Sequence, residues 1–211
     1  MNKEEIQNKI AFRASKELEK SKYVNVGIGI PTLAANYLES DNVFLHTENG
    51  LIGVGPYDAE NRDPSLVNAG KLPVTELSGA AYFSSSESFA MIRGRHIDTV
   101  VLGVLQVDQT GEIANWAIPG KNIIGVGGAM DLLEGAKKVI VTMMHTTKDG
   151  DAKILKELTF PRTSLRKVDM VITELAVFEV HEDGLHLIEI MEGSTLEEIK
   201  EKTEAEFIVD L

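Results

Sequence analysis

The sequence predicts an α/β fold in which helices cover both faces of a largely parallel sheet, giving three layers. Predicted strands alternate with predicted helices along most of the chain, which is the order typical of α/β folds. The segment at 98–107, DTVVLGVLQV, is apolar almost throughout, as expected of a strand buried on both faces. A hairpin and a helix are expected at the C-terminus. No repeat, low-complexity segment or Pro/Ser-rich linker interrupts the chain, so residues 1–211 are predicted to form one domain.

The first elements are predicted from hydrophobic spacing. Four apolar residues recur every four positions among Lys and Glu, which predicts an amphipathic helix. They are Ile6, Ile10, Ala14 and Leu18. Residues 23–30 (YVNVGIGI) alternate apolar with small or polar side chains and predict a strand. Pro31 suits the first turn of a helix, which we expect over 32–38.

The middle of the chain is less regular. A short apolar run at 43–46 predicts a second strand, which stops at the sequence TENG. Residues 48–65 are punctuated by glycine without a clean period, and we expect a long functional loop there. A helix is predicted at 86–93, before the buried strand at 98–107.

The second half predicts a glycine-rich turn, a helix at 129–135 and a buried strand at 139–143. A weak helix is expected at 153–158. The segment 170–180 (MVITELAVFEV) predicts one strand, and the sequence HEDG turns it into an antiparallel partner at 185–190.

A capping box predicts the last helix. Ser194 and Glu197 have the spacing of such a box. The helix that follows is expected to carry Leu196, Ile199 and Phe207 on one side.

Composition excludes several classes of protein. The 211 residues are 43% hydrophobic and 26% charged and include no cysteine, so a disulfide framework, a thiolate nucleophile and a sulfur-ligated zinc site are excluded. A formal charge of −12 argues against nucleic acid as the main partner. No signal peptide and no run of 18 apolar residues is present, so we expect a cytoplasmic protein without a membrane partner. The five histidines lack HxH or HExxH spacing and are interpreted as structural or surface residues, not metal ligands.

Three glycine-bearing segments are candidates for chemistry. GIGIP at 27–31 is either a tight turn or a place where the backbone approaches a phosphate or carboxylate. ENG at 48–50 puts a carboxylate after a buried strand, where ligands bind in α/β sheets, although Asn-Gly is also ordinary turn chemistry. GVGGA at 125–129 opens a helix and exposes N–H groups that suit an oxyanion, or else it serves close packing. Spacing alone leaves both interpretations of each segment open.

Seven segments, in order over nearly the whole chain, closely resemble the B (beta) subunit of the 3-oxoacid CoA-transferase family, the family I CoA-transferases. These segments are VNVGIGIP (24–31), TENGLIGVGPY (47–57), NAGK (68–71), SFAMIRG (88–94), LGVLQVDQTGEIANWAIPGK (102–121), GVGGAMDLLEGAKKVIVTM (125–143) and TELAVFEV (173–180). The resemblance implies an architecture shared with sugar-phosphate isomerases. It also implies a reaction that moves coenzyme A from an acyl-CoA to a free carboxylic acid.

The resemblance implies roles for four residues. Glu48, in ENG, is similar to the family nucleophile, which forms an acyl anhydride and then a glutamyl-CoA thioester. Gly128, in GGA, matches the position whose backbone N–H stabilises the oxyanion. Asn25 and Lys71 match positions that contact CoA. Coenzyme A is then a substrate, and neither a permanently bound cofactor nor a metal is expected.

The resemblance also implies a partner, since the family's A subunit supplies a GxGG-type CoA-binding loop and an oxyanion glutamine. We therefore expect the chain to be inactive alone and to work in an A2B2 heterotetramer. Acetate, butyrate and acetoacetate with their CoA esters are the expected substrates, and succinate with a 3-oxoacid or 3-oxoadipate is the alternative. A sugar-phosphate isomerase and a non-catalytic acyl-CoA sensor are remote alternatives.

Four positions depart from the family pattern without removing a catalytic group. Thr47 replaces the usual Ser, Arg95 a Gly, Ala117 a frequent Met and Met144 a common Glu. Arg95 is expected to be a solvated surface residue.

Overall fold

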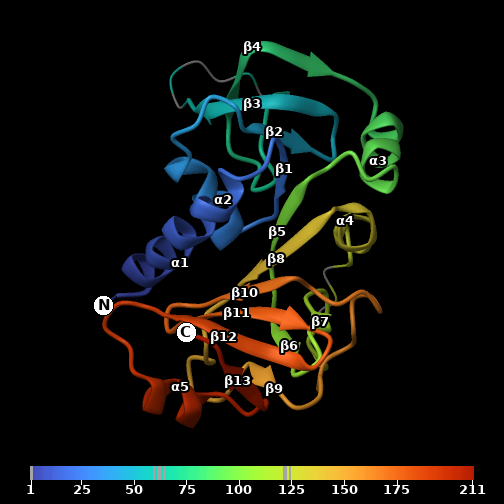
Figure 1. The fold of residues 1–211 in the computed structure, drawn as a ribbon. Helices are drawn as coiled ribbons and strands as arrows, with labels where there is room; N and C mark the ends of the chain where they lie inside the picture. The colour runs from blue at the N-terminus through green and yellow to red at the C-terminus, as the bar shows by residue number, and fades with distance from the viewer. Residues whose placement is uncertain (1, 59, 61–62, 64, 121–122, 124) are drawn as a thin grey trace.

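A ten-stranded sheet runs through the computed structural model, which describes residues 2–58, 60, 63, 65–120, 123 and 125–211 (Figure 1). Its strands are β1 (Tyr23–Val26), β2 (Phe44–Thr47), β3 (Leu51–Tyr57), β4 (Val74–Tyr82), β5 (Thr99–Gly103), β8 (Lys138–Thr142), β10 (Met170–Ile172), β11 (Ala176–His181), β12 (Gly184–Ile190) and β13 (Phe207–Val209). A small second sheet contains β6 (Gln106–Asp108), β7 (Ile113–Ala114) and β9 (Ile154–Leu155). The helices are α1 (Lys3–Leu18), α2 (Ile30–Ala34), the 3₁₀ helix η1 (Ala35–Tyr37), α3 (Ser85–Arg93), α4 (Ala129–Gly135) and α5 (Leu196–Lys202).

The large sheet has the order β13-β12-β11-β10-β8-β5-β1-β2-β3-β4. Its five central strands, β10, β8, β5, β1 and β2, are all parallel. Antiparallel strands flank them on both sides, β3 and β4 beyond β2 and β11 and β12 beyond β10. The predicted α/β fold with a largely parallel sheet is therefore confirmed.

Alternate residues of the central strands point into two separate cores. Val100 and Leu102 of β5 pack in a cluster that includes Leu133 of α4, whereas Val101 between them packs in a cluster that includes Ile10 of α1. In Figure 1, α1 and α2 lie on one side of the sheet and α3 and α4 on the other. Burying an aliphatic side chain of this size contributes about 1.5–3 kcal/mol. The long apolar strands of the sequence are thus explained by burial on both faces, as the three-layer prediction requires.

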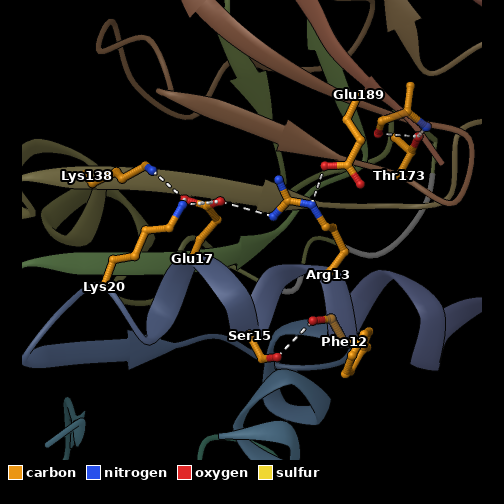
Figure 2. A network of polar contacts seen from close by, with 9 residues as sticks. Phe12, Arg13, Ser15, Glu17, Lys20, Lys138, Thr173 and Glu189 are labelled. Carbon is orange, nitrogen blue, oxygen red and sulfur yellow. Dashed lines mark hydrogen bonds and ion pairs between the residues drawn. The ribbon is translucent and has the colours of Figure 1, made fainter. Parts of the chain in front are cut away.

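Glu17 of α1 ties this helix to the sheet (Figure 2). Its carboxylate is 4% exposed and accepts hydrogen bonds from Arg13 (3.1 Å), Lys20 (2.9 Å) and Lys138 of β8 (2.9 Å). Arg13 also donates to Glu189 of β12 at 2.7 Å. Burial by itself raises the pKa of Glu17, but the hydrogen bonds from Lys20, Lys138 and Arg13 outweigh it and lower the pKa to about 2. The carboxylate is therefore charged at neutral pH, and α1 is held by ion pairs as well as by its apolar face.

The predicted long loop at 48–65 is wrong in part, because Leu51–Tyr57 is strand β3, paired with β2 and β4. The glycines of this segment obscured the alternation of apolar and polar residues that predicts a strand. They are required because β4 packs too closely against them to leave room for side chains. A Cβ on Gly55 would lie 2.4 Å from Thr75 Oγ1, and one on Gly53 would lie 3.1 Å from Ala80. Residues 59, 61, 62 and 64 of this segment, like Lys121 at the end of the segment 102–121, lie outside the described residues.

Two predicted strands are each divided in two. The segment 98–107 breaks after Gly103, and β6 joins the second sheet. The segment 170–180 forms antiparallel β10 and β11, because Thr173 Oγ1 accepts hydrogen bonds from the N–H groups of Leu175 (3.2 Å) and Ala176 (3.0 Å) and closes a turn. A side-chain hydroxyl that binds nearby backbone interrupts a strand without any Gly or Pro in the segment.

The C-terminal hairpin, β11 and β12, is confirmed. Three other details of the second half of the chain differ from the prediction. The weak helix predicted at 153–158 is instead the short strand β9 followed by irregular chain. The last helix is capped by Thr195, which accepts from Glu198 N at 3.2 Å, so it begins one residue later than the Ser194 box predicts. Phe207 lies on β13 and not on this helix, although it packs against the same core. Within the described residues, no helix has the length and apolar character needed to cross a membrane.

Candidate active site

Glu48 lies just beyond the carboxyl end of β2, in the turn that leads into β3. The turn is closed by a hydrogen bond from Gly50 N to Thr47 O (3.2 Å). Gly50 has φ +113°, and a Cβ there would lie 1.9 Å from the carbonyl oxygen of Phe83. Only glycine fits this position. The Asn-Gly pair is thus turn chemistry, and the turn presents Glu48 at the edge of the sheet where α/β proteins bind ligands.

Two of the other predicted site residues contact the Glu48 side chain. Asn25 of β1, 1% exposed, donates from Nδ2 to Glu48 Oε1 at 2.9 Å. Gly128, the N-terminal cap of α4, packs against the other oxygen, since a Cβ there would lie 3.3 Å from Oε2 and 3.2 Å from Cγ. The fold therefore brings together residues 23 and 80 positions apart in the sequence.

Lys71 does not contact Glu48 but lines the same cleft. This open cleft has a volume of about 940 Å³, within the range of small-molecule sites. Apolar side chains such as Leu38 and Val54 form most of its wall, with Glu48 and Lys71 among the polar ones. Of the described lining residues Lys71 is the only cation, and it sits at φ +60° in a loop closed by its N–H donating to Asn68 O (2.9 Å).

His46 and Ser88 lie beneath Glu48, and the sequence did not single them out for the site. His46 is 2% exposed, and its Nδ1 lies 3.3 Å from Asn25 Nδ2. Its Nε2 lies 3.0 Å from Ser88 Oγ, and Ser88 donates to Thr47 O at 3.0 Å. Burial lowers the pKa of His46 to about 4, so the ring is neutral at neutral pH. In the sequence, His46 directly precedes the TENG segment and Ser88 begins the SFAMIRG segment, and these two positions are the features that could have pointed to the site.

No group of three or more His, Cys, Asp or Glu side chains able to hold a metal occurs among the described residues. His145 illustrates why a histidine is present without such a role. It is fully buried and hydrogen-bonds Thr173 and Thr203 at 2.9 Å each, and burial lowers its pKa to about 4. His145 is therefore held inside the core by two threonine hydroxyls.

The four departures from the family pattern lie outside the contacts of Glu48 with Asn25 and Gly128. Arg95 is exposed and follows Gly94, the C-terminal cap of α3. Its φ of +62° is left-handed, and this conformation explains why glycine suits the position. Thr47 accepts from Leu51 N at 3.1 Å, which supports the turn. Ala117 is buried, and Met144 is half-buried against the core beside α1.

A family model described as coenzyme A transferase matches residues 7–202. The chain belongs to the coenzyme A transferase family. This CoA-transferase chain is 52% identical over 203 residues to the B subunit of the succinyl-CoA:3-ketoacid coenzyme A transferase of Helicobacter pylori strain J99, covering 96% of this chain and 98% of that one. It is 50% identical over 202 residues to the beta subunit of the acetate CoA-transferase of Escherichia coli K12, covering 95% and 93%. It is thus a CoA-transferase chain of the B (beta) type.

Solved CoA-transferases share the fold. The apoenzyme of an acyl-CoA transferase from Escherichia coli O157:H7 superposes with a TM-score of 0.77 at 28% identity, covering 97% of this CoA-transferase chain. The chain spans 42% of the length of that protein. The same enzyme has been solved as a thioester complex with CoA, which superposes with a TM-score of 0.75.

Proposed function

We propose that Glu48 is the nucleophile of a CoA transfer between a short-chain acyl-CoA and a free carboxylic acid. A carboxylate oxygen of Glu48 attacks the thioester carbonyl carbon, and the C–S bond breaks to release CoA thiolate and leave an acyl-glutamyl anhydride. The thiolate attacks the glutamyl carbonyl carbon and expels the first acid as its carboxylate, giving a glutamyl-CoA thioester. The acceptor carboxylate then runs the two steps in reverse. Each exchange keeps an activated acyl group, so no external energy source is consumed.

The contacts of Glu48 carry this proposal. Asn25 holds Oε1, and Oε2 lies on the side of Gly128, whose backbone N–H opens helix α4. A backbone N–H at a helix N-terminus suits an oxyanion, because it presents a fixed donor without a side chain in the way. The open cleft beside Glu48 has room for part of an acyl-CoA, and Lys71 on its wall offers a cation to the CoA phosphates.

The substrates and the partner are further parts of the proposal. The relatives are named for succinyl-CoA with a 3-ketoacid and for acetate, at 52% and 50% identity. Short monocarboxylates, 3-oxoacids and succinate are therefore the acids to screen, with CoA as substrate and no resident cofactor. Both relatives are named as one lettered component of their enzymes, B or beta, which supports an A subunit as partner, in an A2B2 assembly. Action in the cytoplasm stays a prediction from the sequence.

Glu48→Gln tests the nucleophile. We expect the chain, assembled with an A subunit, to lose turnover by at least about three orders of magnitude, because no other group replaces an absent nucleophile. Wild-type complex incubated with an acyl-CoA and no acceptor should gain the mass of CoA on the peptide that contains Glu48. Glu39→Gln, an exposed carboxylate outside the cleft, is the control and should turn over normally. A Glu48→Gln complex with normal turnover would reject the assignment.

A further inference from the structure

The buried side chains beneath Glu48 form a series of hydrogen bonds whose donors and acceptors can be assigned one by one. A carboxylate only accepts, so Asn25 must present its Nδ2 amino group to Glu48 Oε1 (2.9 Å). The same amino group lies 3.3 Å from His46 Nδ1. This ring nitrogen must then be the acceptor for the second amino hydrogen. The charge of Glu48 therefore fixes the orientation of the Asn25 amide and the tautomer of His46.

The series continues away from the cleft. With Nδ1 as acceptor, neutral His46 carries its proton on Nε2 and donates it to Ser88 Oγ (3.0 Å). Ser88 in turn donates to the carbonyl oxygen of Thr47, the residue that precedes Glu48 (3.0 Å). The hydrogen bonds thus begin at the Glu48 carboxylate and end on the backbone of the same turn.

The surroundings keep the ring neutral. The groups that face it are Asn25 from β1, Ser88 from α3 and the ring of Phe83, which stacks on it with centroids 5.8 Å apart. None of these three titrates, and the described hydrogen bonds connect Glu48 to the ring through Asn25. A protonated His46 would set two donors against each other at Nδ1 and would offer Glu48 a positive charge that lowers its nucleophilicity. A neutral ring avoids both effects.

We infer that His46 and Ser88 are positioning residues for the proposed nucleophile, holding the Glu48 carboxylate through Asn25. This inference rests on the proposed function of Glu48. Without an acceptor at His46 Nδ1, the amide of Asn25 has lost one of its two anchors and can rotate. Without Ser88, the Nε2 proton of His46 loses its acceptor among the described contacts, and the ring is held only through Nδ1. Either loss leaves Glu48 chemically intact but no longer held in one orientation.

Ser88→Ala is the first test, because the described hydrogen bonds of the Ser88 hydroxyl go to His46 and to the Thr47 carbonyl and not to the side chains of Asn25 or Glu48. In the complex with an A subunit, we expect kcat to fall about 10- to 100-fold, the effect of misplacing a reacting group. The KM for acyl-CoA should stay within about twofold, since the cleft wall is unchanged. Rates are normalised to the sites that bind CoA covalently, so that unfolded protein does not count. Ser85→Ala, an exposed serine of the same helix, is the matched control and should behave as wild type.

A pair of variants at position 46 separates positioning from packing. His46→Gln retains a donor and an acceptor and cannot be protonated, whereas His46→Leu has neither. We expect His46→Gln to recover at least about a third of the wild-type kcat and His46→Leu to lose as much as Ser88→Ala. Equal losses of kcat in His46→Gln and His46→Leu would overturn the inference. So would a wild-type kcat in both His46→Leu and Ser88→Ala. If Glu48→Gln is inactive while these variants are normal, only the positioning role fails; if Glu48→Gln is active, the proposed function itself fails.

Discussion

Gly128 has no side chain at a point where a methyl group would crowd the side chain of Glu48. A methyl group there would lie 3.2–3.4 Å from three atoms of Glu48, the flexible end of a side chain rather than backbone. The backbone of Gly128, at φ −82° and ψ 0°, accommodates alanine. Space beside the carboxylate, and not backbone freedom, is therefore what glycine provides here.

Gly128→Ala should consequently affect catalysis more than stability. The added methyl displaces Glu48 by a few tenths of an ångström, and we expect kcat to fall about 10- to 100-fold while the melting temperature changes little. Steady-state kinetics of the A/B complex and thermal unfolding of the same preparation measure the two effects. An unchanged kcat would show that Glu48 does not depend on this contact.

At position 95 the backbone conformation, and not the space for a side chain, favours glycine, although this chain has Arg95 there. His96 N donates to Met91 O and Arg95 N to Ile92 O, the two hydrogen bonds of a Schellman motif, with Arg95 at φ +62°. We predict that Arg95→Gly stabilises the protein by about 0.5–1 kcal/mol, because relief of about 1–2 kcal/mol of left-handed strain exceeds the entropy that glycine adds to the unfolded chain. Urea unfolding measures this difference. Arg95→Ala keeps the strain and should match wild type; equal stabilisation by Ala would locate the effect in the lost side chain.

At the scale of the elements, α1 is held in two ways. Its apolar face was readable from the sequence, and Ile10, Ala14 and Leu18 are all 0% exposed. The ion pairs of Glu17 with Lys138 were not readable, because 121 residues separate the two partners. Periodicity reports which face of a helix is buried, but not which charged residues meet across the layer.

Glu17→Gln should therefore loosen α1. We expect a loss of about 1–3 kcal/mol at pH 7, below the value for a fully buried ion pair, because Lys20 and Lys138 are partly exposed and solvent screens their charges. The pKa of Glu17 is lowered from 4.5 to about 2, so the unfolded state binds more protons between these values and the stabilising effect is lost as pH falls through that window. Denaturant unfolding at pH 7 and at pH 3 should show the difference between variant and wild type shrinking at the lower pH. A pH-independent difference would assign the loss to packing instead.

The whole molecule presents its proposed site in an open cleft. The 940 Å³ cleft is lined by residues from 26 to 78, and Lys71 is its only cation among the described lining residues. With a formal charge of −12, the chain as a whole repels the phosphates of CoA. One lysine in the cleft of a negatively charged chain provides little attraction for these phosphates, which supports the proposal that a second protein chain supplies further contacts for CoA.

We accordingly predict that the chain by itself transfers CoA at less than about 1% of the rate of its complex with an A subunit, the scale of losing an oxyanion donor. Transfer from acyl-CoA to a short carboxylic acid is measured for the chain alone, for the A subunit alone and for the mixture. Thermal unfolding of the lone chain serves as the folding control. Strong transfer by the folded lone chain would contradict the partner proposal.

Local patterns in the sequence determined the layers of the fold, the bounds of α4 and the C-terminal hairpin, because periodicity and turn chemistry act over a few residues. Motif resemblance singled out Glu48, Asn25, Gly128 and Lys71, whose roles stay predictions. Only the tertiary structure decided that Leu51–Tyr57 is a strand, since its glycines are explained by a neighbour 20 or more residues away. The same holds for His46 and Ser88. Their link to Glu48 depends on hydrogen bonds between β1, β2 and α3, which chain folding brings together and local spacing does not encode.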